Sequence, residues 1–216
     1  MNSPTHDLPN IEGIDPDVAK VAYKKAKQNF AILDNHVRCG STLRYHCNDT
    51  MNHRPQSVAQ HCWNMNSLLY RLYPVEPPAS LVRAIHHHDS AEFWVGDVPY
   101  PAKVKSPELA ALLDKLEASV LTDNRIQVPF LTDEEKAWLK FLDRFESYLY
   151  MTSVPGAEPW PLNELVVLMQ QLGKLTPAIP AEWHDAILVP LSIDVSDRFE
   201  SNAELAALAA EALTPT

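Results

Sequence analysis

Residues 84–97 read AIHHHDSAEFWVGD, and this stretch changes character part-way along what begins as a buried helix. On a helix, one face carries Leu81, Ile85, His88 and Glu92, at spacings of four, three and four. Ionisable groups therefore continue a stripe that apolar residues begin. Burying an unpaired charge is costly or shifts its pKa until the group is neutral. The stretch predicts that an interior site holds something charged, typically a cation.

Two other predicted helices carry stripes of the same kind. One runs through Val58, His61, Met65, Leu68 and Leu72, and another through Leu139, Asp143, Glu146 and Tyr150. A single histidine on an apolar face is more often a hydrogen-bonded core residue than a ligand. Three interrupted stripes in one chain are harder to explain in that way.

The fold class follows from how the chain is punctuated. Five glycines, eighteen prolines and little sustained alternation predict an all-α domain in which proline turns separate the helices. Residues 1–14 are expected to form a flexible tail, and residues 15–216 one helical domain. Helices are predicted from Asp15 to Gly40, from Ser57 to Leu72, from Pro78 to Gly96, for about fifteen residues after Ser106, and over 133–151, 162–173, 181–189 and 202–213. Residues 41–56 and 96–105 are expected to be loops.

Composition excludes several classes of protein. The net charge of −10 leaves no basic stripe for a nucleic-acid backbone, so we expect a small anionic substrate and no nucleic-acid polymer. No apolar run approaches the roughly 18 to 20 residues of a membrane span, and the N-terminus lacks the order of a signal peptide. Cys39, Cys47 and Cys62 form no C-x-x-C pair and predict no disulfide framework. We therefore expect a cytoplasmic protein that does not bind membranes.

The candidate metal ligands are His61, the adjacent pair His88 and Asp89, and Asp143. Two imidazoles and two carboxylates form a mixed nitrogen and oxygen set that suits Mn²⁺, Fe²⁺, Co²⁺ or Mg²⁺, with Zn²⁺ also acceptable. Such a set leaves coordination positions for water or a phosphate oxygen. The residues thus predict a catalytic divalent metal site.

The order of these residues resembles the HD-domain metal-dependent phosphohydrolases, which are named after an adjacent His-Asp pair. Residues 88–103 match H-D-x-x-E-x-x-x-x-D-x-P-x-P-x-K, while D-E-E-K at 133–136 and V-x-x-H at 58–61 recur with it in the bacterial 5′-deoxynucleotidase branch. The resemblance covers about residues 40–150. Phage deoxynucleoside triphosphate hydrolases are similar.

The resemblance implies roles for individual residues. It makes His61, His88, Asp89 and Asp143 the metal ligands. It makes Glu92 and Asp97 the catalytic pair, with Asp97 positioning the attacking water and Glu92 serving the leaving oxygen.

A second group of residues is implied to bind substrate. Arg44 would hold the phosphate, since a guanidinium can give two parallel hydrogen bonds. Tyr45 would contact the deoxyribose, although it stands where that branch more often has tryptophan, which bears on how strictly ribose is excluded. Lys103 is a further phosphate candidate, and a solvated loop lysine is an equally good description of it.

These expectations combine into a functional hypothesis. The chain is predicted to be an HD-type phosphohydrolase that converts a deoxynucleoside 5′-monophosphate to deoxynucleoside and phosphate. The alternatives are a triphosphohydrolase, which converts a deoxynucleoside triphosphate to deoxynucleoside and triphosphate, and a non-catalytic nucleotide- or metal-binding protein. Related enzymes are commonly dimers, so a homodimer or higher homo-oligomer is also expected.

Overall fold

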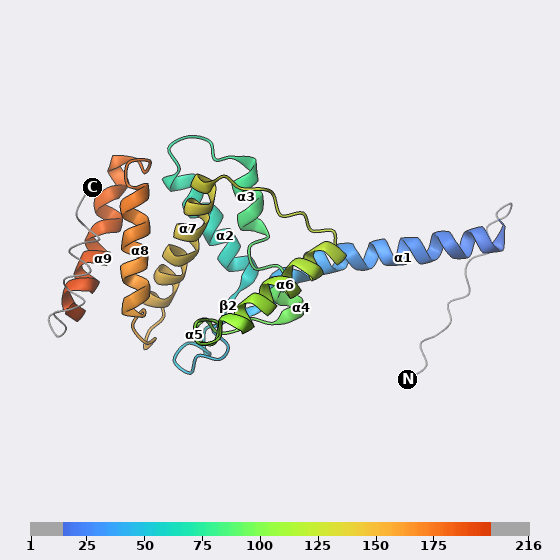
Figure 1. Ribbon diagram of the computed structural model, residues 1–216, viewed down its shortest axis with the longest axis horizontal. Coiled ribbons are helices and arrows are strands. Elements are labelled where there is room, and N and C mark those ends of the chain that lie inside the picture. Colours follow the sequence, from blue (N-terminus) through green and yellow to red (C-terminus); the bar gives the residue numbers. More distant parts are fainter. Residues whose placement is uncertain (1–14, 200–216) are drawn as a thin grey trace.

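The all-α prediction is confirmed in the computed structural model, which describes residues 15–199. Within that range, strands are limited to one antiparallel pair of two-residue strands. Figure 1 shows α1 (Pro16–Arg38) projecting from a body of packed helices, with α8 (Leu162–Leu175) and α9 (His184–Phe199) at the opposite end. The predicted tail at 1–14 and the predicted helix at 202–213 lie outside the described residues.

Helix α7 (Asp133–Thr152) forms the centre of the body, where it packs against α2, α3 and α8. It begins with a capping box, in which Thr132 Oγ1 accepts from the Glu135 amide at 3.2 Å and Glu135 Oε2 accepts from the Thr132 amide at 2.8 Å. Trp138, Phe141 and Leu142 of α7 are fully buried. This helix therefore supplies both the core and, through Asp143, part of the candidate site.

Helices α2 (Val58–Leu72) and α3 (Ala79–His86) pack together against α7. The predicted N-cap of α2 is confirmed, because Ser57 Oγ accepts from the amide of Gln60 at 3.1 Å. Met65 of one stripe and Ile85 of the other are completely buried, while Leu68 is partly buried against the same core. The interrupted stripes thus face the interior, as their patterns predict.

The predicted continuous helix between Pro78 and Gly96 is wrong. Helix α3 ends at His86, residues 87–91 form tight turns, and α4 (Glu92–Val95) is a separate single turn. The amide of His88 donates to the carbonyl of Ile85, and that of Glu92 to the carbonyl of Asp89, three residues back rather than four. Neighbouring side chains on an α-helix point about 100° apart, so the break lets both His88 and Asp89 face the same site.

The region after Gly96 also differs from expectation. Gly96 has a φ of 83°, which ends α4 in a conformation that favours glycine. The predicted loop over 96–105 then contains α5 (Tyr100–Lys105). Proline is compatible with the first turn of a helix, and the two prolines of this segment obscured it. Helix α6 (Pro107–Asp123) follows as predicted, with Ser106 Oγ accepting from the amide of Leu109.

Residues 39–57 connect α1 to α2 and carry the first substrate candidates. A 3₁₀ turn, η1 (Cys39–Ser41), leads to β1 (Leu43–Arg44), which pairs with β2 (Gln56–Ser57), so this segment is not wholly the loop predicted for 41–56. A Cβ at Gly40 would lie 2.8 Å from Cβ of Ala59, so this glycine allows η1 to approach α2 closely.

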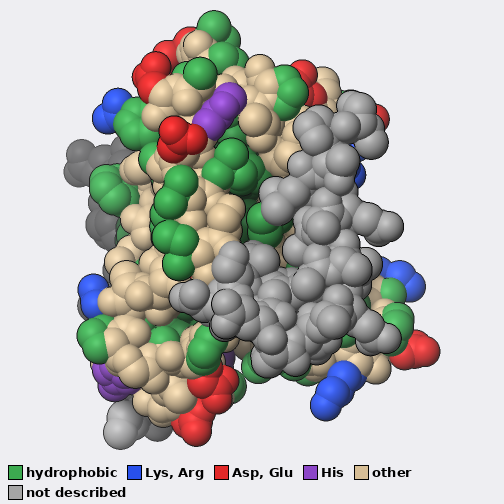
Figure 2. Space-filling model, turned by 90° about the vertical axis from the view of Figure 1, so that its left-hand side faces the viewer, with side chains coloured by type: hydrophobic (Ala, Val, Ile, Leu, Met, Phe, Trp, Pro, Cys, Tyr) green, Lys and Arg blue, Asp and Glu red, His purple; other side chains and the backbone are tan. Residues whose placement is uncertain are grey.

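At the other end of the body, α8 confirms the predicted helix over 162–173. A 3₁₀ turn, η2 (Ala181–Trp183), precedes α9, which extends well beyond the predicted end at residue 189. The face of the molecule seen in Figure 2 lies at this end, and hydrophobic side chains are spread over it between charged ones. Val189 and Ile193 of α9 are exposed. No helix among residues 15–199 has the length and apolar character needed to cross a bilayer.

Candidate functional site

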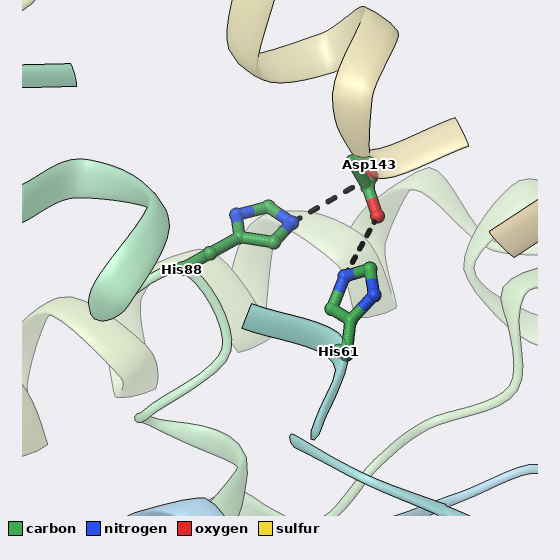
Figure 3. A group of neighbouring side chains, drawn as sticks. All are labelled: His61, His88 and Asp143. Carbon is green, nitrogen blue, oxygen red and sulfur yellow. Dashed lines mark ion pairs between the residues drawn. The ribbon is translucent and has the colours of Figure 1, made fainter. Parts of the chain in front are cut away.

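Three helical segments bring His61, His88 and Asp143 together, as Figure 3 shows. One ligand atom from each side chain lies within 4.8 Å of the others. His61 Nε2 is 3.2 Å from Asp143 Oδ1, and His88 Nε2 is 3.6 Å from Asp143 Oδ2. Helix α2, the turn after α3 and helix α7 thus each contribute one donor, so residues 82 positions apart in sequence meet at one point.

Asp89 lies beside this group. Its Oδ1 is 3.3 Å from His88 Nε2, and its Oδ2 is 3.7 Å from His61 Nε2. The structure therefore brings together all four residues that the sequence nominated as metal ligands, two of them through the break in the predicted helix. Their role as ligands stays a prediction.

Glu146 fixes the orientation of the His61 ring through the nitrogen that faces away from His88 and Asp143. Its Nδ1 donates to Glu146 Oε2 at 2.5 Å, and Glu146 Oε1 accepts from Gln56 Nε2 and Asn64 Nδ2, each at 2.6 Å. The proton on Nδ1 leaves Nε2 as a lone pair directed at His88 and Asp143. That atom is fully buried and has no hydrogen-bond partner.

The unsatisfied nitrogen tests whether a metal suits this site. A buried polar atom without a partner is costly, and metal-binding histidines usually donate their other ring nitrogen to a carboxylate or carbonyl. His61 has both properties. Together with the mixed donors of His88 and Asp143, it fits a divalent cation, whose identity the donor set leaves among the first-row metals and Mg²⁺.

The pKa values of Asp143 and His88 show that the carboxylates of this group favour a positive charge between them. Burial alone would raise the pKa of Asp143, but the charge of His88 and its hydrogen bond hold the pKa of that carboxyl well below its ordinary value. Burial alone would lower the pKa of His88, but Asp89 and Asp143 raise it to about 9. The carboxylates therefore attract a cation, and a proton on His88 fills that need when no metal is bound.

Exposure is graded across the group. The side chain of His61 is 0% exposed, whereas those of His88 and Asp143 are 25% and 32% exposed. The site thus has a closed side at His61 and Glu146. Its open side is at His88 and Asp143.

Arg44 lies next to the candidate ligands. Its Nη1 donates to Gln56 Oε1 and its Nη2 to Ser147 Oγ, both at 3.1 Å. Its guanidinium nitrogens are also 3.9 Å from Asp143 Oδ1 and 4.0 Å from Asp89 Oδ2. Although burial alone would lower the pKa of Arg44, the neighbouring ionisable groups raise it, so the guanidinium stays charged.

Tyr45 follows in an uncommon backbone conformation. Its φ is 64°, in the left-handed region, which costs energy for a residue with a side chain. Its ring stacks on Tyr150, with centroids 5.8 Å apart and an interplanar angle of 7°. The Tyr45 ring thus packs on α7, and the guanidinium of Arg44, 5.3 Å from the centre of that ring, lies beside Asp89 and Asp143.

Glu92 is a second buried carboxyl beside the candidate ligands, with 8% exposure and an Oε2 that has no hydrogen-bond partner. Burial, with Asp89 and Asp97 nearby, raises the pKa of Glu92 to about 9, although Arg44 and Lys103 oppose this increase. Glu92 therefore carries a proton at neutral pH. Asp97 is partly buried, with Oδ2 3.9 Å from His46 Nδ1, and its charge helps to raise the pKa of Glu92.

The residue that the sequence did not assign is Glu146. It lies three residues after Asp143 on the same stripe of α7, and it is 2% exposed. Its partners Gln56, His61 and Asn64 are far from it in the chain, so spacing alone could not assign it the role of holding His61. The feature of the sequence that could have indicated this role is that Glu146 is a second acid on the inward face, one turn after the proposed ligand Asp143.

Comparison with known proteins gives one weak relationship. No family model matches the chain, and no solved structure matches it. A protein of cyanophage S-2L named dATP triphosphohydrolase is 27% identical over 141 residues, which cover 62% of this chain and 79% of that protein. The chain is therefore distantly similar to a nucleotide hydrolase.

Proposed function

We propose that residues 15–216 form an HD-type phosphohydrolase domain that cleaves the ester bond between the 5′ oxygen and the α-phosphorus of a deoxynucleotide, with a divalent metal as cofactor. The observation that carries the proposal is the buried, unpartnered Nε2 of His61 facing His88 and Asp143. The relative from cyanophage, whose name includes a deoxynucleotide, supports the substrate class.

Four residues would hold the metal: His61, His88, Asp89 and Asp143. When bound there, a divalent ion supplies Lewis-acid chemistry, lowering the pKa of a water and offsetting negative charge on the phosphoryl group. The chain itself supplies the orientation of the donors. Glu146 keeps the Nδ1 proton of His61 in place, so that Nε2 stays free.

Glu92 and Asp97 have complementary roles in this proposal. Burial raises the pKa of Glu92 and so favours its protonated form, and in this proposal Glu92 donates that proton to the departing 5′ oxygen as the P–O bond breaks. Asp97 accepts a hydrogen bond from the attacking water and receives its proton as the new P–O bond forms. The product is a deoxynucleoside with a free 5′ hydroxyl and a phosphate or polyphosphate anion.

Arg44 binds a non-bridging phosphate oxygen in this scheme. Its hydrogen bonds to Gln56 and Ser147 hold the guanidinium in a fixed plane beside the candidate ligands. Tyr45, whose backbone conformation is fixed by the same segment, packs near the sugar and favours a substrate without a 2′ hydroxyl. The positive charge of Lys103, on α5, lowers the pKa of Glu92. In this scheme Lys103 binds a further phosphate oxygen.

The length of the phosphate chain has two candidates. The motif over residues 88–103 favours a deoxynucleoside monophosphate, whereas the relative named dATP triphosphohydrolase favours a triphosphate. Both reactions break the same ester bond. The anion that is released therefore distinguishes them, phosphate in one case and triphosphate in the other.

The deciding experiment incubates the full chain, loaded separately with Mn²⁺, Co²⁺, Mg²⁺ and Zn²⁺, with dAMP, AMP, dATP and ATP. Ion chromatography then identifies the anion, and chromatography of the nucleoside measures turnover. We expect faster release from the deoxy forms than from the ribo forms. Equal rates on deoxy and ribo substrates would refute the deoxynucleotide assignment, and binding without turnover for every metal would favour the non-catalytic alternative.

A further inference from the structure

Helix α1 carries an apolar seam that no described part of the chain covers. The seam comprises Ala19, Tyr23, Ala26, Phe30, Leu33 and Val37, at alternating spacings of four and three. This is the heptad spacing with which one helix packs along another. The large members are exposed: Tyr23 by 48%, Phe30 by 70%, Leu33 by 65% and Val37 by 83%.

The opposite face of α1 is the one that contacts the body. Asn35 Nδ2 donates to Asn124 Oδ1 at 2.8 Å, and the buried Cys39 follows one turn later. Asn35 and Cys39 lie roughly on the far side of the helix from Phe30 and Val37. The seam therefore points away from the body along the whole helix, which Figure 1 shows projecting into solvent.

We propose that this seam is a self-association surface, on which α1 of a second copy of the chain packs antiparallel about a twofold axis. The argument comes from the order of residue sizes. With the axis level with Gln28, Phe30 of one copy lies opposite Ala26 of the other, and Val37 lies opposite Ala19. Tyr23 and Leu33 then fill the layer between these pairs. Each large side chain meets a small or complementary one, as close packing between helices requires.

Charge along the seam fits the same arrangement. Lys20 and Asp34 flank the seam on one side, and the antiparallel register places Lys20 of each copy opposite His36 of the other, two residues from Asp34. Twofold symmetry repeats the favourable pair, because the same patch serves both copies.

The state of α1 in a single copy gives a separate reason for a partner. Residues 16–28 make no tertiary hydrogen bond with any other described residue. A free helix of about that length is marginal in water, because most helix stability in proteins comes from packing an apolar face. A second α1 supplies that packing. This surface is on the outside of the molecule, and the proposal is independent of the metal site.

Sedimentation velocity of the full chain, over a wide concentration range, tests the proposal. We expect a dimer for the wild type, and a rise of roughly tenfold or more in the dissociation constant for Phe30→Glu and for Val37→Glu. Phe130→Glu is the matched control, since Phe130 is 89% exposed but lies in the segment before α7, and it should leave the dimer unchanged. Both seam positions are exposed, so circular dichroism should report a monomer whose body stays folded, with any loss of helix confined to α1.

The register has its own test. Lys20→Glu should weaken the dimer, and adding Asp34→Lys in the same chain should restore it, since opposite charges again lie near each other. A wild type that stays monomeric at every concentration overturns the proposal. A dimer that survives both seam substitutions also overturns it, and a dimer that the double variant weakens further overturns the antiparallel register.

Discussion

At the scale of single residues, Asp143, like Asp89, lies beside both histidines of the candidate site. We expect Asp143→Asn to abolish binding of Mn²⁺ or Co²⁺ in calorimetry and to remove activity, because the change deletes a charged oxygen while keeping the shape of the side chain. Asp114→Asn, an exposed change on α6, is the control. Wild-type metal affinity in Asp143→Asn would show that the site lies elsewhere.

Glu92 should behave differently from a ligand. We expect Glu92→Gln to keep metal binding but to reduce kcat by roughly 10²- to 10⁴-fold, since the amide fills the same space and cannot give up a proton to the leaving oxygen. Measuring metal affinity and kcat on the same preparation separates the two roles. Loss of metal in this variant would make Glu92 a ligand instead of an acid.

Glu146 should act on the metal through His61. Glu146 accepts hydrogen bonds from Gln56, His61 and Asn64. In Glu146→Gln at least one of these donors faces the new side-chain NH₂ group, so the orientation of His61 is no longer fixed. We expect metal affinity to fall by about 10- to 100-fold. Glu164→Gln is the matched control, because Glu164 is a buried acid of α8 paired with Arg144. Equal effects of the two changes on metal affinity would indicate a general loss of packing.

At the scale of elements, the start of α7 depends on a local motif. Thr132→Ala removes the hydroxyl that accepts from the Glu135 amide, and we expect a loss of about 1 kcal/mol in the free energy of unfolding. Urea denaturation followed by circular dichroism measures it. Thr122→Ala, which removes a hydroxyl near the end of α6, should cost less because it caps no helix start. A loss no larger than that of the control would mean that the cap contributes little.

The elements also show what a sequence can and cannot predict. The starts of α2, α6 and α7 were predictable, because Ser57, Ser106 and Thr132 bond to amides three residues away. The break between α3 and α4 was not, because nothing in the local pattern of residues 84–97 disfavours a helix. What distinguishes it is that His88 and Asp89 both contact groups on distant helices, and that information is tertiary.

The candidate site shows the same division. The convergence of His61, His88 and Asp143 could be expected from three interrupted stripes, since each stripe had to face one core. The residues around them could not be assigned in this way. Glu146 has no signature beyond being acidic on an inward face, and its function depends on partners that the fold, not the spacing, brings to it.

At the scale of the whole molecule, the buried groups of the site predict how stability depends on pH. In the metal-free protein, the pKa of Glu92 rises from 4.5 to about 9 and that of His88 from 6.5 to about 9. The folded state therefore binds protons more tightly than the unfolded state in these windows. We expect the free energy of unfolding to fall as pH rises from about 5 to 9, because both groups then lose protons more readily from the unfolded state than from the folded state.

Denaturation of the metal-free protein across that range measures the slope. Glu92→Gln should remove the decline between about pH 5 and 6.5, where Glu92 alone contributes, and leave part of the decline above pH 6.5 to His88. At low pH the sign reverses, because the depressed pKa of Asp143 makes stability fall as that carboxyl takes up a proton. A wild-type stability that increases from pH 5 to 9 would contradict the prediction.

The graded exposure of the site, closed at His61 and open at His88 and Asp143, bears on how an ion enters and leaves. A bound ion would be held by His88 and Asp143 on the open side and by the buried imidazole of His61 on the closed side, so its path to solvent would pass His88 and Asp143. Loading and removal by a chelator should therefore be fast compared with global unfolding, and the emptied protein should reload without refolding. The activity of such a protein would then rise and fall reversibly with the free concentration of the metal in solution.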